Sequence, residues 1–194
     1  QLNTFTVNVA EQLGEKGIQV GKFIPIVEMD LPPKPPDIEE NKESKKAWRR
    51  KATEARNINA GAAKRAVRTL MTLKAVDKFK GKEFFIPWSF DYRGRAYPIP
   101  AFLTPQDTDF GKSLIRFSNE SVVTAEAMHW LAFQVATTYG LDKASMEERL
   151  AWVAKRDNIF TITRVATDPI GNRPDWEVAE EPWQFLAACD EYYH

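Results

Sequence analysis

The stretch FIPWSFDYRGRAYP, residues 85–98, decides the fold and carries the densest chemistry of the chain. Two arginines, Arg93 and Arg95, flank Gly94, with Asp91 before them and aromatic residues on both sides. Guanidinium groups bind phosphates through paired hydrogen bonds, and a glycine lets a backbone approach a ligand closely. From these residues alone, two interpretations stay open. One is a contact site for nucleic acid or a nucleotide, and the other is a tight hairpin turn in which Asp91 neutralises an arginine.

Residues 42–82, just ahead of this stretch, carry fourteen basic residues against three acidic ones, although the whole chain has a formal net charge of zero. Such an excess predicts a surface for a polyanion, whose binding is strongly salt-dependent because phosphate contacts release counterions. The alternative is a solvated helix face. Small and apolar residues recur here at three- and four-residue spacing, so we expect a helix over 44–79 with Ser44 as its N-cap.

Weak helix formers interrupt this pattern at Asn57, Asn59 and Gly61, and they predict a kink or a break there. Before the helix we expect a short helix over 1–13 and an extended, proline-rich connection, since proline inside a helix removes a hydrogen bond.

Strand signals follow Gly81. Residues 83–87 and 95–99 are aromatic or branched, so we expect a two-stranded piece with 91–94 at its tip.

Helical patterns return in the last third of the chain. We expect a helix over 124–139 that ends at Gly140, another that begins at Ser145 with a capping box, and a loop over 168–174. A final helix follows Pro182, with Phe185, Leu186 and Cys189 facing inward.

Composition limits the function classes. At 194 residues and 43% hydrophobic, the chain is long enough to bury a core. No segment approaches the roughly 20 apolar residues of a membrane span, so no membrane partner is predicted. The lone Cys189 excludes an internal disulfide and a cysteine-based zinc site, and His129 and His194 have no ligand spacing.

The pattern D-x-R-G-R-x-Y at Asp91–Tyr97 resembles a signature of the single-subunit, phage-type DNA-dependent RNA polymerases, which also work in mitochondria and plastids. Further segments resemble motifs of that family, in the family's order. They are residues 1–8, 31–38 with 47–50, 105–117, 140–143 and 181–192. The resemblance covers nearly the whole chain.

The resemblance implies an α+β, predominantly α-helical fold with three parts. Residues 1–82 would form a thumb-like region with a long helix and a proline-rich crossing at 25–43. Residues 83–120 would begin the palm, with the D-x-R-G-R motif on a short β-hairpin, and 121–194 would form a helical palm insertion. The family's D-G-x-x-x-G-x-Q-H and H-D-S segments, which hold the catalytic aspartates, do not occur in this sequence. We therefore expect an internal fragment without catalytic or metal-binding residues of its own.

The resemblance also implies roles for particular residues. The nucleic-acid-binding set would be Arg93, Arg95, Tyr97, Arg49, Arg56, Lys64, Arg65, Arg68 and Lys112. Lys143, with Asp142 before it, would contact the triphosphate of the incoming nucleotide, although a lysine just after a helix end often only complements the helix dipole. Asp91 would orient an arginine rather than hold a metal.

By the same resemblance, the parent protein would be a DNA-directed RNA polymerase that transfers nucleotides with two Mg²⁺ ions, whose ligands lie outside this chain. Its partners would be the DNA template, the RNA transcript, nucleoside triphosphates and the remaining polymerase domains. Its location would be the cytoplasm of a phage-infected bacterium or, alternatively, a mitochondrion or plastid. Two other hypotheses remain: a stand-alone helical nucleic-acid-binding module without catalysis, and a structural or protein-interaction domain.

Overall fold

The computed structural model describes residues 1–194, which form eight helices and one two-stranded antiparallel sheet. The predicted α+β, predominantly helical class is confirmed. The elements in chain order are α1 (Thr4–Glu15), α2 (Lys42–Phe79), β1 (Trp88–Phe90), β2 (Ala96–Pro98), α3 (Asp109–Ser113), α4 (Ala125–Tyr139), α5 (Met146–Val153), α6 (Arg156–Thr167), α7 (Arg173–Glu177) and α8 (Pro182–Tyr193).

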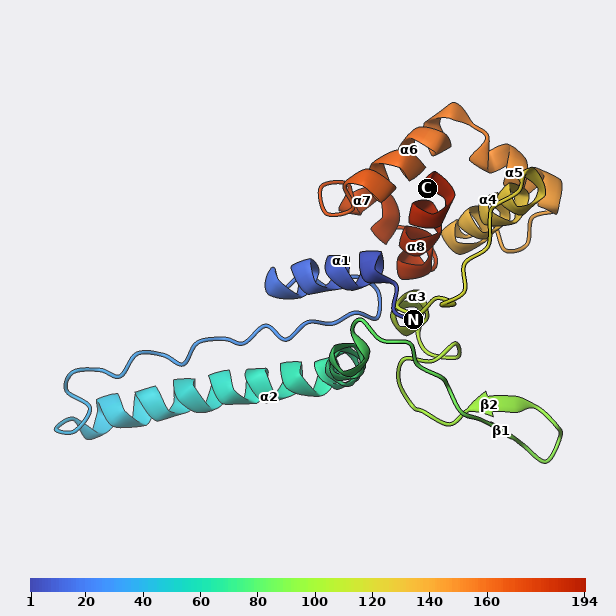
Figure 1. The fold of residues 1–194 in the computed structure, drawn as a ribbon. Coiled ribbons are helices and arrows are strands. Elements are labelled where there is room, and N and C mark those ends of the chain that lie inside the picture. The colour runs from blue at the N-terminus through green and yellow to red at the C-terminus, as the bar shows by residue number, and fades with distance from the viewer.

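Three bodies radiate from the middle of the molecule (Figure 1). Helices α4 to α8 gather at one end, with α1 and α3 next to them. Helix α2 projects away on one side, and the β1–β2 hairpin projects on the other. The last turns of α2 point in a different direction from the rest of the helix (Figure 1).

Helix α8 is the centre of the core, and it packs against α4, α6 and α3. Its residues Phe185, Leu186 and Cys189 are fully buried, as the sequence predicts. Burial raises the pKa of the Cys189 thiol far above its ordinary value, so this group is an apolar packing element rather than a nucleophile.

An aromatic cluster joins α8 to the rest of the chain. The ring of Phe23 lies 4.9 Å from that of Phe110 and 5.2 Å from that of Trp183, and the Phe110 and Trp183 rings are 4.8 Å apart. The indole N–H of Trp183 donates to the backbone oxygen of Val20 at 3.1 Å. Because the three rings are almost completely buried, they fix the segment around Phe23 to α3 and α8 of the helical body.

Several helix ends agree with the sequence patterns. Helix α4 begins after Thr124, whose side chain caps it, and ends at Gly140 with φ +134°. Ser145 and Glu148 form the predicted capping box at the start of α5. Pro182 occupies the first turn of α8.

The start of α2 differs from the prediction. Its N-cap is Asn41, not Ser44, because the Asn41 carboxamide oxygen accepts from the backbone N–H groups of Glu43 at 2.9 Å and Ser44 at 3.2 Å. Asparagine caps helices as well as serine does. The Ser44 hydroxyl instead donates to the Asp37 carboxylate at 2.7 Å, and this bond lowers the pKa of Asp37.

Other boundaries also move. The first helix starts at Thr4, because Asn3 caps it, and ends at Glu15. The predicted loop over 168–174 ends earlier, since α7 begins at Arg173 with Pro174 in its first turn. The expected break at 57–61 does not occur, and α2 is one continuous helix.

The hairpin is present, but its first strand is Trp88–Phe90 rather than 83–87. Trp88 pairs with Pro98, and Phe90 pairs with Ala96, so the tight turn at 91–94 sets the register. Of residues 83–87, only Pro87 reaches the hairpin, where its backbone oxygen accepts from the Ile99 N–H at 2.9 Å, and the others come too early to have partners along the short second strand. Among them, Phe84 packs its ring 4.9 Å from that of Phe79 at the end of α2.

Candidate nucleic-acid interface

The basic residues of 42–82 are largely free of acidic partners. Only Lys45, Arg68 and Lys80 form ion pairs, with Glu39, Asp107 and Glu11 respectively. The remaining eleven bases of this segment pair with no carboxylate, and Arg49, Arg50, Arg56, Lys64 and Arg65 are all exposed. An exposed helix with unpaired cations provides a continuous positive surface for a polyanion.

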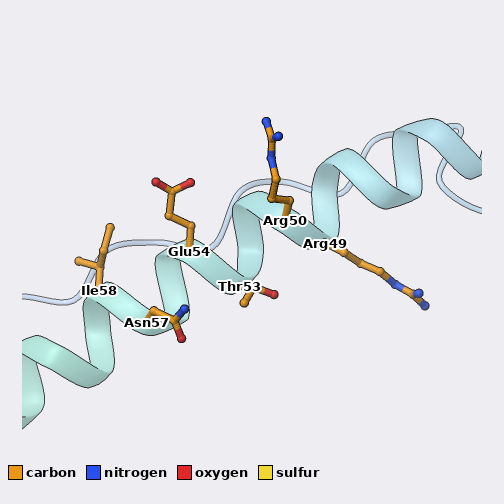
Figure 2. A pocket seen from close by; sticks show the side chains of 6 residues that line it. All are labelled: Arg49, Arg50, Thr53, Glu54, Asn57 and Ile58. Atoms are coloured by element: carbon orange, nitrogen blue, oxygen red, sulfur yellow. The ribbon is translucent and has the colours of Figure 1, made fainter.

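The shape of this surface is open. Figure 2 shows two rows of side chains on α2: Arg50, Glu54 and Ile58 along one side, and Arg49, Thr53 and Asn57 along the other. All six belong to one helix, and each row repeats every four residues, so no second element encloses the space between them. Such a face suits an extended, charged partner better than a small molecule, which needs a concave site.

The hairpin has two chemically different faces. Because side chains alternate along a strand, Trp88 and Phe90 share one face with their partners Ala96 and Pro98, while Tyr97 lies on the other face opposite Ser89. Asp91 and Arg95 form the next pair on the polar face, since the Asp91 N–H donates to the Arg95 backbone oxygen at 2.9 Å. The D-x-R-G-R motif therefore presents Arg95 and Tyr97 together.

Asp91 builds the turn that carries the two arginines. Its carboxylate accepts from the backbone N–H groups of Arg93 at 2.8 Å and Arg95 at 2.9 Å, and Gly94 completes the turn at φ +77°. The same carboxylate lies 3.7 Å from the Arg93 guanidinium. Both guanidinium groups stay exposed at the tip of the hairpin, and that of Arg95 has no acidic partner.

Arg68 lies in a different environment from the other predicted phosphate contacts. Its guanidinium donates to the carboxylate of Asp107 at 2.5 and 3.2 Å and lies 5.6 Å from the centre of the Phe102 ring. The Asp107 side chain is completely buried, whereas that of Arg68 is 51% exposed. This pair links α2 to the segment between the hairpin and α3.

Lys143 and Asp142 are exposed in the turn between α4 and α5. The buried side chain of Arg149, in α5, holds this turn through hydrogen bonds. Its guanidinium donates to the backbone oxygen of Asp142 and, at 2.9 Å, to the hydroxyl of Thr137, and it lies 4.2 Å from the centre of the Phe133 ring. The position of the Lys143 backbone therefore depends on a side chain that the sequence interpretation missed.

A second carboxylate links distant parts of this body. Asp109, at the start of α3, accepts from the backbone N–H groups of Trp183 at 2.9 Å and Gln184 at 3.0 Å, which are free donors in the first turn of α8. Burial raises the pKa of Asp109 above its ordinary value, and these hydrogen bonds oppose that rise. Lys112, one turn further along α3, is half-buried and pairs with no acid.

The predicted site residues thus lie in separate groups. Arg93, Arg95 and Tyr97 lie on the hairpin, and Figure 1 places that hairpin and the first half of α2 at opposite sides of the molecule. Arg49 and Arg56 lie on that first half, and Lys64, Arg65 and Arg68 follow further along. The chain does not bring these groups together into one cavity.

Sequence reasoning missed the structural roles of three residues: Asp107, Arg149 and Asn59. Asn59 stands out in the sequence only as a weak helix former, and Arg149 only because it stands four residues before Val153 on the inward face of α5, where a charge is unexpected.

No group of three or more His, Cys, Asp or Glu side chains is arranged to hold a metal ion. Among the helices, none combines the length and the hydropathy that crossing a bilayer requires.

A long basic helix and an arginine-bearing hairpin are features expected of a nucleic-acid-binding protein. Comparison with known proteins gives the family. Residues 121–194 match the family model described as DNA-dependent RNA polymerase.

Individual relatives cover nearly the whole chain. It is 31% identical over 185 residues, 95% of its length, to the DNA-directed RNA polymerase of Enterobacteria phage T3. It is 30% identical over 98% of its length to the mitochondrial DNA-directed RNA polymerase of Neurospora crassa, and 30% identical over 97% to the chloroplastic/mitochondrial DNA-directed RNA polymerase 2 of Arabidopsis thaliana.

These matches confirm the resemblance to the phage-type, single-subunit RNA polymerases that the ordered motifs indicate. The chain spans 20% of the length of the phage T3 relative and 13% of that of the Neurospora relative. The relatives come from phages, mitochondria and chloroplasts.

Proposed function

We propose that this chain is the part of a phage-type RNA polymerase that grips the template and the RNA–DNA hybrid. The observation that carries the proposal is the row of unpaired, exposed bases along α2, a helix that projects away from the helical body. A rod of positive charge with a length of several turns matches the repeating phosphates of a nucleic-acid backbone.

The three parts have separate tasks in this proposal. Residues 1–82 are the thumb, 83–120 begin the palm, and 121–194 are the palm insertion. Arg49, Arg56, Lys64 and Arg65 hold phosphates along the thumb, which gives affinity without sequence preference. Arg68 has a weaker case as a phosphate contact, because two of its N–H groups already donate to Asp107.

The hairpin supplies a second, more specific contact. Arg95 and Tyr97 share its polar face, and Arg93 extends from its tip, so guanidinium groups meet phosphate or sugar while the Tyr97 ring meets a template base or sugar. Lys112 is a further phosphate contact from α3. Asp91 acts only by fixing the turn.

The turn between α4 and α5 is the triphosphate contact. Lys143 is exposed and pairs with no acid, so its ammonium group is free to meet a phosphate, with Asp142 beside it. The backbone bond from Arg149 to Asp142 holds the turn in place.

The parent protein, in this proposal, is a DNA-directed RNA polymerase that joins nucleoside triphosphates on a DNA template. It uses Mg²⁺, whose ligands the family resemblance places outside this chain. Its location is a phage-infected bacterial cell or an organelle, the two settings of the relatives. Because those relatives are named polymerases, they favour this function over a binding module without catalysis.

The test is binding of the 194-residue chain to a short RNA–DNA hybrid across a salt series. Changing Arg93 and Arg95 together to Ala should weaken binding and lower the salt slope by about one to two units, roughly one for each phosphate contact. The matched control changes Lys155 and Arg156, two exposed bases at the start of α6, to Ala and should leave the slope unchanged. If the wild-type chain does not bind the RNA–DNA hybrid at low salt, the proposal is refuted.

A further inference from the structure

An extended segment runs along α2 and covers its inner side. Residues 22–36, here called the strap, pass from the base of α2 to its far end, antiparallel to the helix (Figure 1). No other helix lies along the first half of α2 (Figure 1), yet Ala52 and Ala55 are almost completely buried. The strap therefore provides the cover, and small alanine side chains let it approach the helix closely.

Side chains of α2 fasten the strap at three points. The indole N–H of Trp48 donates to the Pro32 backbone oxygen at 2.8 Å, and the Thr69 hydroxyl accepts from the Ile24 N–H at 3.0 Å. Between these two points lies Asn59. No backbone–backbone hydrogen bond joins the strap to the helix, so these side chains form its only direct hydrogen bonds to α2.

Asn59 makes the most complete of the three contacts. Its carboxamide oxygen accepts from the Met29 N–H at 2.8 Å, and its carboxamide nitrogen donates to the Met29 backbone oxygen at 2.9 Å. One side chain thus satisfies both backbone groups of one strap residue. These groups would otherwise rely on water, because an extended chain has no hydrogen bonds of its own.

The position of this contact coincides with the weakest part of the helix. Asn57, Asn59 and Gly61 lower the intrinsic stability of an isolated helix, and asparagine side chains compete for the backbone groups of their own helix. Here the Asn59 carboxamide bonds to the strap instead, and the helix continues unbroken through 57–61.

We propose that Asn59 is a positioning residue for nucleic-acid binding. It fastens the strap across the weak part of α2, and so keeps Arg49 and Arg56 in line with Lys64 and Arg65. The inference rests on the proposed function, because it assigns to Asn59 an effect on hybrid affinity without any contact with the hybrid. Without the Asn59 contact, the two halves of the helix would move independently. Binding of a polyanion would then cost the conformational entropy of aligning the two halves.

The experiment compares Asn59→Ala with Gly61→Ala in the 194-residue chain. Both changes raise the helix propensity of the weak part of α2, and a Cβ at Gly61 would meet only the Arg65 side chain, at an ordinary contact distance of 3.7 Å. Propensity alone predicts equal or slightly tighter hybrid binding for both variants. If the Asn59 contact aligns the helix, binding should be about three- to tenfold weaker for Asn59→Ala alone, which is part of the effect of losing two hydrogen bonds. Asn59→Gln, which keeps the carboxamide, should fall between Asn59→Ala and the wild type.

Two further readouts separate positioning from charge and from failure of the fold. The salt slope should stay the same in Asn59→Ala, because no cation is removed. Amide hydrogen exchange at Met29 should be slow in the wild type and fast in Asn59→Ala, while the amides of α8 keep their protection.

The outcomes are distinguishable. Faster exchange at Met29 with unchanged hybrid affinity would overturn the positioning role and leave the proposed function intact. Equal weakening of binding in Gly61→Ala would also overturn it. If the wild type itself binds no hybrid, the proposed function fails, and the positioning role fails with it.

Discussion

The carboxylate of Asp107 joins three segments of the chain, and its removal should be among the most damaging single changes. One oxygen accepts from the Arg68 guanidinium and, at 2.7 Å, from the Thr108 N–H. The other accepts from the N–H of Leu103 at 2.9 Å. Leu103 is the one non-glycine residue with a positive φ, at +56°, so this bond also holds a strained backbone.

The magnitude follows from burial on the two sides of the ion pair. Asp107→Ala leaves Arg68 half-exposed and able to hydrate, but it strands the buried N–H of Leu103, so we expect a loss of about 3 kcal/mol. Arg68→Ala instead leaves a fully buried carboxylate with two backbone donors, and the expected loss is about 4 kcal/mol. The double variant should lose about 4 kcal/mol, well below the sum, because the two side chains act as one unit.

Urea unfolding followed by tryptophan fluorescence measures these values. Asp107→Ala should lower Tm by roughly 6–12 °C in a chain of this size. The control is Glu11→Ala, which removes an ion pair of similar length, 2.7 Å to Lys80, between side chains that are 42% and 55% exposed. An exposed ion pair contributes far less than a buried one, because water screens both charges.

A loss in Asp107→Ala no larger than that in Glu11→Ala would refute the reasoning from burial. Additive losses in the Asp107 and Arg68 double variant would refute the claim that the two side chains form one unit.

Three further predictions concern other sites. A Cβ at Gly111 would lie 2.4 Å from the Asp107 carboxyl carbon, so Gly111→Ala should destabilise the folded chain by about 2 kcal/mol. At Gly61 a Cβ meets nothing closer than 3.7 Å, so Gly61→Ala should stabilise the folded chain by about 0.5–1 kcal/mol through its higher helix propensity. Urea unfolding measures both changes. The Ser145 backbone N–H, and then its hydroxyl, lower the pKa of Glu148 from 4.5, so its contribution to stability is full above pH 4.5 and is lost as the pH falls through the lowered pKa. Glu148→Gln should therefore flatten the acid side of a Tm-against-pH curve, and an unchanged slope would contradict this. Arg149→Met should release the turn at Asp142, which faster amide exchange at 140–144 would reveal, without a change in the salt slope of hybrid binding.

Local sequence signals determined the class of the fold and many element ends. The apolar spacing of α2, the capping box at Ser145 and the glycine after α4 act within one or two helical turns, so neighbouring residues suffice to predict them. The turn at Asp91–Gly94 is equally local, and its prediction is confirmed. The ordered motifs likewise indicated the polymerase family without any structure.

Predictions failed where a local preference competed with a distant partner. Ser44 is an acceptable N-cap, but Asn41 takes that role while Asp37 accepts the Ser44 hydroxyl. Asn59 and its neighbours favour a break in α2, but the strap, which lies 30 residues earlier in the chain, uses the Asn59 carboxamide and the helix continues. The first strand moved because the pairing register, not the branched residues of 83–87, decides which residues form a ladder.

The sequence by itself therefore determined the helices, the hairpin turn and the excess of positive charge, since each depends on neighbouring residues or on composition alone. Only the tertiary structure decided which of those charges are free and which are used. Arg68 is paired because Asp107, 39 residues away, lies beside it, and α8 is capped because Asp109, 74 residues away, faces its first turn. Such pairs form between residues that the chain brings together only when the core closes, and no local pattern encodes them.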